Sequence, residues 1–386
     1  MREFLFPIER DDGRTLQAQI RGALERAVAS GSFAPGDAAP STRRLAEALG
    51  VSRNTVSLAF QALVDQGVLE AKERSGYYIA SFGVAAAPAF VAAGPGIDWS
   101  RRMAGPSAGF ESVPRPLDWR LAPFPFIYGQ FDPELFPIAE WRDASRKAMG
   151  RRWLDDWTED RYAEDDPMLI EEIRRRILPR RGVAAEPDEI LITLGAQNAI
   201  FLAVSLLIPE GEAAAIEDPG YPDARAIMAA RAGRLTLQPV DADGMVVDAR
   251  LKGARLIYVT PSHQHPSLVS MTLERRRVLL DLAQEEDAVI LEDDYEPEAS
   301  AMGPQRPALR ALDQRGRVLY AGSLSKSMMP GLRLGFLVGA REFIAEARAL
   351  RRLMFRHPPG MNQRVAALFM AARHHDMLLG RMRRDG

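Results

Sequence analysis

The sequence has 386 residues, a net charge of −2, 47% hydrophobic residues and 26% charged residues. These values are typical of a soluble globular protein with two or three domains, and they exclude a polycation that binds nucleic acid over its whole surface. The lack of cysteine excludes disulfides and thiolate sites, and no secretory leader or membrane-spanning apolar run is present, so we expect a cytoplasmic location.

The first 80 residues have the pattern of three helices followed by a two-stranded wing. Apolar residues recur at helical spacing in the first helix, and Ser52 can cap the third. Gly50 and Val51 separate the second helix from the third, which is the spacing of a helix-turn-helix. The expected helices cover residues 15–30, 43–49 and 52–66, and the expected hairpin covers residues 68–80.

The start of the third helix is the part of such a unit that enters the major groove. Arg and Asn can make paired hydrogen bonds to base edges, whereas Ser and Thr suit phosphates. Residues 1–80 hold ten basic and ten acidic side chains, so charge alone does not separate this unit from an ordinary helical bundle. The residues that we expect to contact DNA are Arg43, Arg44, Ser52, Arg53, Asn54, Thr55, Ser57, Arg74 and Gly76.

Residues 81–118 are rich in Ala, Gly and Pro without a period, which is the composition of a linker. From residue 119 to residue 386, short apolar strands alternate with helical stretches. This alternation predicts an α/β fold with a mostly parallel sheet covered by helices on both faces. The expected strands cover 190–193, 213–217, 235–240, 255–260, 288–292, 318–322 and 335–338, and the expected helices cover 196–207, 221–232 and 273–286.

Polar turns follow several of these strands, and open α/β sheets bind ligands beyond the carboxyl ends of their strands. The turn that ends in Lys326 offers an amine for an aldehyde, and Ser323 and Arg333 can hold a phosphate. Asp293 can keep a pyridine nitrogen protonated, and Tyr295 can donate to a ring oxygen. These are the groups that pyridoxal 5′-phosphate (PLP) needs.

Two more turns add to this set. Gly195, Ala196 and Gln197 open a predicted helix whose backbone N–H groups can approach a phosphate, and Tyr221 can stack on a ring. Each turn alone is as consistent with an ordinary surface turn, and only their convergence indicates a cofactor site. The histidines at 263 and 265 lack partners at metal-ligand spacing, so we expect no metal site.

Both halves resemble known families. Residues 14–80 resemble the winged helix of the GntR superfamily through the segments Pro40–Ala46, Gly50–Val56 and Ser75–Ile79. The chain from about residue 121 resembles the large domain of fold-type I aminotransferases through Glu217–Pro222, Thr260–Pro266, Glu292–Tyr295 and Ser323–Arg333. Together they resemble the MocR-type regulators. The segments 126–132, 165–167 and 178–182 look most similar to the EnuR-type subgroup, which regulates catabolism of ectoine and hydroxyectoine.

The resemblance implies a transcriptional regulator, not an enzyme, that carries PLP as an internal aldimine on Lys326. It implies a double-stranded DNA operator, an amino-bearing effector (an ectoine-derived compound in the EnuR-type subgroup), and a homodimer in which Tyr162 reaches the partner's site. Two alternatives remain open. One is an aminotransferase with an accessory DNA-binding domain, and the other is a repressor whose second domain only dimerises.

The sequence departs from the family at several positions. Ala38 and Ala39 stand where Arg-Leu is usual, and His265-Pro266-Ser267-Leu268 stands where aminotransferases have Asn-Pro-Thr-Gly. Asp223 occupies a position at which some members carry an effector-binding Arg, and Ala163 replaces a Gly. The sequence also ends soon after Lys326, so we expect the small C-terminal domain of the family to be missing.

Overall fold

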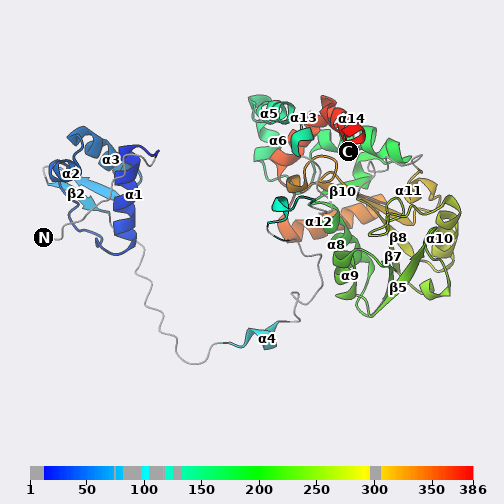
Figure 1. The fold of residues 1–386 in the computed structure, drawn as a ribbon. Helices are drawn as coiled ribbons and strands as arrows, with labels where there is room; N and C mark the ends of the chain where they lie inside the picture. Colours follow the sequence, from blue (N-terminus) through cyan, green and yellow to red (C-terminus); the bar gives the residue numbers. More distant parts are fainter. Residues whose placement is uncertain are drawn as a thin grey trace. The chain divides into compact units, whose positions relative to one another are not determined.

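The computed structural model describes residues 13–73, 75–80, 97–103, 116, 118–124, 133–295 and 306–385. The chain divides into two compact units, Met1–Arg102 and Met103–Gly386, and the division falls inside the segment predicted as a linker. Figure 1 follows the chain through both units, which are described separately below. The short helix α4 (Trp99–Arg102) lies in that predicted linker segment.

The N-terminal unit consists of three helices and a hairpin, as predicted. Its elements are α1 (Leu16–Ala29), α2 (Thr42–Leu49), α3 (Arg53–Asp65), β1 (Leu69–Lys72) and β2 (Gly76–Ile79). The side chains of Thr15, Ser41 and Ser52 accept hydrogen bonds from the first turns of α1, α2 and α3. Gly50 ends α2 in the left-handed region, at φ +62°. Because each cap satisfies a free N–H at a helix start, the helix bounds follow closely from the sequence.

The larger unit is built on one eight-stranded sheet in the order β3-β10-β9-β8-β7-β4-β5-β6. The five strands from β9 to β5 are parallel, whereas β10 is antiparallel to both of its neighbours and β6 is antiparallel to β5. The strands are β3 (Ile190–Thr193), β4 (Ala213–Asp218), β5 (Arg234–Asp241), β6 (Gly244–Met245), β7 (Leu256–Val259), β8 (Val289–Asp294), β9 (Val318–Ser323) and β10 (Gly335–Val338).

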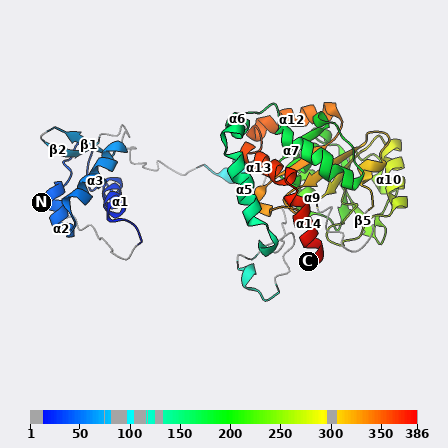
Figure 2. The same cartoon turned by 90° about the horizontal axis from the view of Figure 1, so that it is seen from above.

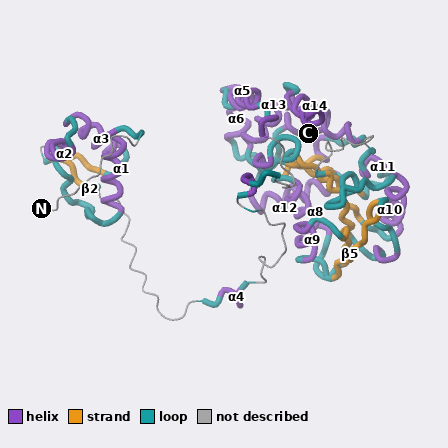
Figure 3. Tube along the Cα trace, in the orientation of Figure 1, coloured by secondary structure: helices purple, strands orange, loops and turns teal. Residues whose placement is uncertain are grey.

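Helices cover both faces of this sheet, which confirms the predicted α/β class (Figure 3). One face packs against α8 (Ala196–Leu207), α9 (Pro222–Ala229) and α12 (Arg341–Phe355). The other face packs against α10 (Leu273–Glu285), α11 (Leu309–Leu312), α7 (Pro167–Glu172) and α13 (Gly360–Ala371). Three further helices, α5 (Ile138–Ala148), α6 (Leu154–Thr158) and α14 (His374–Asp385), pack around α13 (Figure 2). No helix in the described ranges is both long and apolar enough to cross a membrane.

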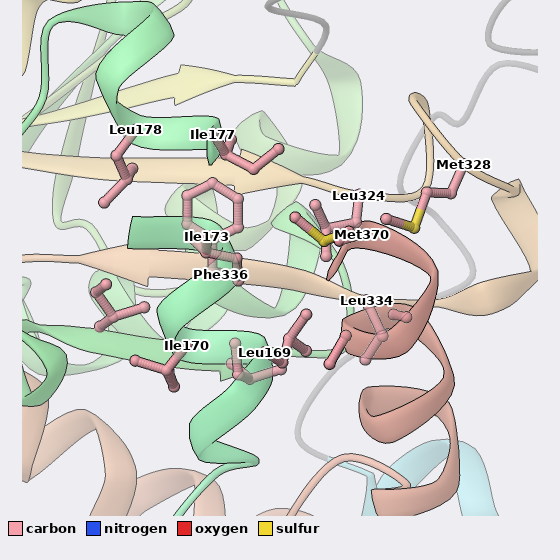
Figure 4. Close-up of a cluster of buried hydrophobic side chains, with 14 of the residues drawn as sticks. Leu169, Ile170, Ile173, Ile177, Leu178, Leu324, Met328, Leu334, Phe336 and Met370 are labelled. Carbon is pink, nitrogen blue, oxygen red and sulfur yellow. The ribbon is translucent and has the colours of Figure 1, made fainter. Parts of the chain in front are cut away.

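The turn that carries Lys326 is anchored in the hydrophobic core. Leu324 and Met328, two residues to either side, are fully buried in the cluster drawn in Figure 4. That cluster also contains Phe336 of β10 and Met370 of α13. Because close-packed interiors hold side chains in defined positions, this anchoring fixes where the lysine between the two apolar residues can lie.

Some elements differ from the sequence prediction. The strand expected to end at Glu292 continues to Asp294, so all three successive carboxylates lie within β8. The helix expected from Tyr221 begins at Pro222, and Tyr221 occupies the position before its first turn. The short strand β6 and the helices α5, α7, α12 and α13 were not predicted.

Candidate functional site

A cavity of about 480 Å³ lies at the carboxyl ends of the parallel strands. Its walls come from turns that follow β3, β4, β7, β8 and β9, and from the segment before β10. The lining residues are Ala196, Gln197, Tyr221, Asp223, Tyr258, Thr260, His265, Asp293, Tyr295, Ser323, Ser325, Lys326, Pro330, Gly331 and Arg333. The fold therefore brings together eight of the ten residues that the sequence predicted for the cofactor. The other two are Gly195 and Tyr162.

Two of the three carboxylates of β8 bind residues of the surrounding fold and do not line the cavity. Glu292 and Asp294 face away from the side of the sheet to which Asp293 points, because side chains alternate along a strand. Both are buried. Glu292 accepts hydrogen bonds from the first N–H groups of α11, those of Leu309 and Arg310. Asp294 accepts from the side chains of Arg181 and Tyr320 at 2.7 and 2.8 Å.

Asp293 is different because, of the three carboxylates, it is the one that lines the cavity. The Tyr258 hydroxyl donates to Oδ2 at 2.7 Å, whereas the buried Oδ1 accepts no hydrogen bond from any described residue. Burial raises the pKa of Asp293 to about 7, and the hydrogen bond from Tyr258 acts in the opposite direction. A buried carboxylate with an unsatisfied oxygen is costly, and a cationic donor in the cavity would relieve that cost.

The part of the cavity beside the start of α8 is suited to a phosphate. Arg333 donates from Nη2 to the carbonyl of Leu194 at 3.2 Å and lies against Gly195. A Cβ atom at Gly195 would stand 3.0 Å from that Nη2, and the residue has φ +80°. Gly195 therefore lets the guanidinium approach the start of α8, where Ala196 and Gln197 line the cavity and the helix N-terminus favours anions.

Aromatic rings surround the cavity on the side of β4, β7 and β8. The rings of Tyr221 and His265 meet edge to face with centroids 5.8 Å apart, and those of His263 and Tyr295 are 5.9 Å apart. The Lys326 amine lies 5.9 Å from the centroid of Tyr295. Burial, together with the charge on Lys326, lowers the pKa of His265. This wall can enclose a flat ring.

Tyr162 does not line the cavity of its own chain. The residue is 41% exposed, and its ring lies beneath the guanidinium groups of Arg352 and Arg356, whose central carbons are 5.7 and 4.8 Å from the ring centroid. That Tyr162 reaches the cavity of a partner chain therefore stays a prediction.

The residues predicted to contact DNA lie on or near α2, α3 and the hairpin of the N-terminal unit. Arg43, Arg44, Arg53 and Asn54 are exposed. The hydroxyls of Ser52 and Thr55 bond each other at 2.8 Å, and Ser52 also accepts from the Thr55 N–H, so this pair caps α3. Ser57 is half-buried, and Gly76 begins β2 at φ +104°. Arg74 lies outside the described residues.

The structure adds cavity residues that the sequence did not single out, among them Tyr258, Thr260 and Ser325. Thr260 donates to the buried carboxylate of Glu217, whose pKa burial raises to about 7. A sequence signal existed for Tyr258. It is a tyrosine in an otherwise aliphatic buried strand, and a buried hydroxyl needs a polar partner.

Two family models match the chain. Residues 16–79 match bacterial regulatory proteins of the gntR family, and residues 131–383 match aminotransferase class I and II. The HTH-type transcriptional regulator TauR of Rhodobacter capsulatus is 46% identical over 378 residues, which cover 96% of this chain and 77% of that protein. The probable rhizopine catabolism regulatory protein MocR of Rhizobium meliloti is 30% identical over 380 residues, which cover 98% of this chain and 76% of that protein.

Solved aminotransferases share the fold of the larger unit. LysN, the α-aminoadipate aminotransferase of Thermus thermophilus, solved in complex with N-(5′-phosphopyridoxyl)-L-leucine, aligns with a TM-score of 0.64 and 28% identity. The alignment covers 75% of this chain and 74% of that one. The kynurenine aminotransferase of Pyrococcus horikoshii, whose complex contains PMP, aligns with a TM-score of 0.61 at 26% identity, over 66% and 65% of the two chains.

Proposed function

The chain belongs to the MocR-type branch of the GntR family of bacterial regulatory proteins, and we propose that it is a PLP-dependent transcriptional regulator that senses an amino-bearing metabolite. The observation that carries the proposal is the meeting of Lys326, Asp293 and Arg333 in one cavity of about 480 Å³. Asp293 lies more than thirty residues before Lys326 and Arg333, which share the connection between β9 and β10, and each of the three would supply a different group that the cofactor needs.

The cavity fits PLP group by group. Oδ1 of Asp293, which has no partner among the residues that the structure describes, would face the protonated ring nitrogen, Tyr221 would cover the ring, and Tyr295 would donate to the ring oxygen. The phosphate would lie at the start of α8, held by Ser323, Arg333 and the turn at Gly195, Ala196 and Gln197. When bound, PLP supplies an aldehyde that condenses with primary amines. This chain would hold the Lys326 amine and the Asp293 carboxylate in the lining of the same cavity.

The proposed effector is a metabolite with a primary amine, because only an amine can compete with Lys326 for an aldehyde. Regulation requires that this effector bind two states of the protein with different affinity. An ectoine-derived amine is one candidate for the effector. The proposed partners are an operator in duplex DNA and a second copy of this chain, with Tyr162 directed to the partner's cavity, and the proposed location is the cytoplasm, where that DNA lies.

In the N-terminal unit, we propose that the exposed Arg53 and Asn54 read base edges and that Arg43 and Arg44 contact phosphates. The caps formed by Ser52 and Thr55 would fix the start of α3 against the groove, with Ser57 one turn further along that helix. Arg74 and Gly76 complete the proposed DNA-contacting set at the wing.

The direct test uses the purified full chain with PLP. We expect a visible absorption band that shifts when a primary amine is added, and selection from a random DNA pool should enrich a defined operator. Absence of the band at saturating PLP would contradict the cofactor assignment, and failure to enrich any sequence would contradict the regulator assignment.

A second candidate function is an aminotransferase with an accessory DNA-binding unit. The likeness to LysN and the presence of both Lys326 and Asp293 in the cavity favour it. Incubation with an amino acid and a keto acid distinguishes the two. Steady formation of a new keto acid over many turnovers would support the enzyme, whereas the regulator is expected to complete one half-reaction at most.

A further inference from the structure

Tyr258 occupies a central place in the sheet of the larger unit. It lies on β7, where it pairs with Ile216 of β4 on one side and with Leu291 of β8 on the other. The residue is fully buried, yet it contributes to the lining of the cavity. A tyrosine in such a place must find a partner for its hydroxyl, since an unpaired buried hydroxyl costs free energy.

The partner of Tyr258 is the carboxylate of Asp293. The phenol donates to Oδ2 at 2.7 Å. Because one oxygen is held in this way, rotation of the carboxylate about its bond to Cβ would break the hydrogen bond. The other oxygen, Oδ1, is the one left without a partner among the described residues.

A matched pair lies on the other face of the same sheet. Tyr320 of β9 is also fully buried, and its hydroxyl donates to Oδ2 of Asp294 at 2.8 Å. The Asp294 carboxylate also accepts a hydrogen bond from the side chain of Arg181, and neither Tyr320 nor Asp294 lines the cavity. The two pairs share chemistry and burial, and they differ in whether the carboxylate reaches the cavity.

We propose that Tyr258 is a positioning residue of the cofactor site, which holds the carboxylate of Asp293 ionised and in one orientation so that its second oxygen receives the ring nitrogen of PLP. This inference rests on the proposed function, because it presupposes that PLP occupies the cavity. Tyr258 would act on the cofactor through Asp293. Nothing in the chemistry of Tyr258 requires a contact with the cofactor itself.

The electrostatics around Asp293 show why such a donor is needed. Burial and the neighbouring charge of Asp294 favour the neutral acid, and they are opposed by Tyr258 and by Lys326. Glu217, at the end of β4, is a further buried acid: burial raises its pKa to about 7, and the nearby charge of Asp293 acts in the same direction. Loss of the phenol would leave the carboxylate with two unsatisfied oxygens, which favours protonation and removes the charge that pairs with a pyridinium.

The experiment compares Tyr258→Phe with Tyr320→Phe in the full chain. The probe is 4′-deoxypyridoxine 5′-phosphate, which keeps the ring nitrogen and phosphate but has no aldehyde for Lys326. We expect Tyr258→Phe to weaken its binding roughly tenfold at neutral pH and to move the acidic limb of the affinity profile to higher pH, because a charged hydrogen bond is lost. Tyr320→Phe should bind the probe as the wild type does, although both variants lose a buried hydrogen bond.

A double-mutant cycle with Asp293→Asn gives the second readout. If Tyr258 acts through Asp293, adding Tyr258→Phe to Asp293→Asn should cost little further affinity. Should Tyr258→Phe not fold, Tyr258→His retains a ring N–H donor, and the inference then predicts affinity closer to wild type than that of Asp293→Asn. Equal losses in the two Phe variants, an unchanged pH profile or full additivity would overturn the inference. Wild-type protein that binds neither PLP nor the probe would instead contradict the proposed function.

Discussion

The two units of this chain build their candidate sites in opposite ways. In the N-terminal unit the candidate DNA-binding side chains lie on α2, α3 and a hairpin, within a few dozen residues of one another, and Arg53 and Asn54 are exposed. In the larger unit the candidate cofactor residues that line the cavity come from strand ends and turns between residues 196 and 333, and Asp293 is buried. The first site depends on local capping, and the second depends on the whole sheet.

This difference has a consequence for substitutions. Exposed side chains on one helix act nearly independently of the core, so their loss should weaken a contact without changing the fold. Side chains around the cavity share neighbours, so a change in one should alter the others.

The largest expected effect is that of Lys326→Ala. Without this amine the cavity lining has no lysine to hold an aldehyde covalently, so we expect complete loss of the visible band with PLP while binding to selected DNA persists. Lys252→Ala is the matched control, because Lys252 is exposed and lies outside the cavity lining. An unchanged band in Lys326→Ala, or a band lost in Lys252→Ala, would show that the wrong lysine has been assigned.

Arg53→Ala should act only on DNA. Loss of an arginine that bonds a base edge costs about 1–3 kcal/mol, so we expect roughly ten- to hundredfold weaker binding to selected DNA in a gel-shift assay at fixed salt. The absorption spectrum with PLP should be unchanged. Arg231→Ala, an exposed arginine of the larger unit, controls for general loss of charge. A weakening of similar size in Arg231→Ala would show that the Arg53 contact is nonspecific.

Gly195→Ala should weaken cofactor binding about tenfold, because the new Cβ would displace the Arg333 guanidinium and remove a charged contact to phosphate. Gly211→Ala is its control. Gly211 has φ +90° but open space around it, so the backbone strain is comparable and no guanidinium moves. Both variants should melt at lower temperature, and only Gly195→Ala should raise the PLP dissociation constant. Equal dissociation constants in the two would place the phosphate elsewhere.

The smallest effect concerns stability against pH in the protein without cofactor. Burial raises the pKa of Asp293 from 3.8 to about 7, so its neutral form stabilises the folded state at low pH and this contribution is lost as pH rises through 7. Glu217 and Glu292, whose pKa burial also raises to about 7, act in the same direction. Asp293→Asn should therefore lose less stability than wild type between pH 5 and 8, by on the order of 1 kcal/mol in urea unfolding. Identical slopes would mean that Asp293 is solvated in the cofactor-free state.

Much of the fold could be predicted because local signals determine it. Ser52 and Gly50 marked the ends of α3 and α2, and the apolar segments Ile190–Thr193 and Gly335–Val338 are strands with the expected bounds. The helices α5, α12 and α13 escaped prediction. Fully buried arginines at 351 and 364, on α12 and α13, show how far these helices depart from a simple apolar-inside pattern. Their partners Asp165 and Asp166 are nearly two hundred residues away in sequence.

The cavity was predictable in outline and not in its interior. Turns after parallel strands had to meet at one edge, which placed Lys326, Asp293 and Tyr221 together. The sequence could not show which of the three carboxylates of β8 reaches the cavity and which bind other residues of the fold. It depends on Arg181 and the start of α11, which engage Asp294 and Glu292 and leave only Asp293 to the cavity.

The central claim is that an amine at the cavity changes how tightly the other unit holds DNA. The most direct measurement is the affinity of the PLP-loaded full chain for selected DNA at fixed salt, titrated with a panel of primary amines that includes ectoine-derived ones, in wild type and in Lys326→Ala. The account predicts that at least one amine shifts the wild-type affinity and that the shift disappears in Lys326→Ala. A shift of the same size in both proteins, or an affinity that no amine changes, would contradict it.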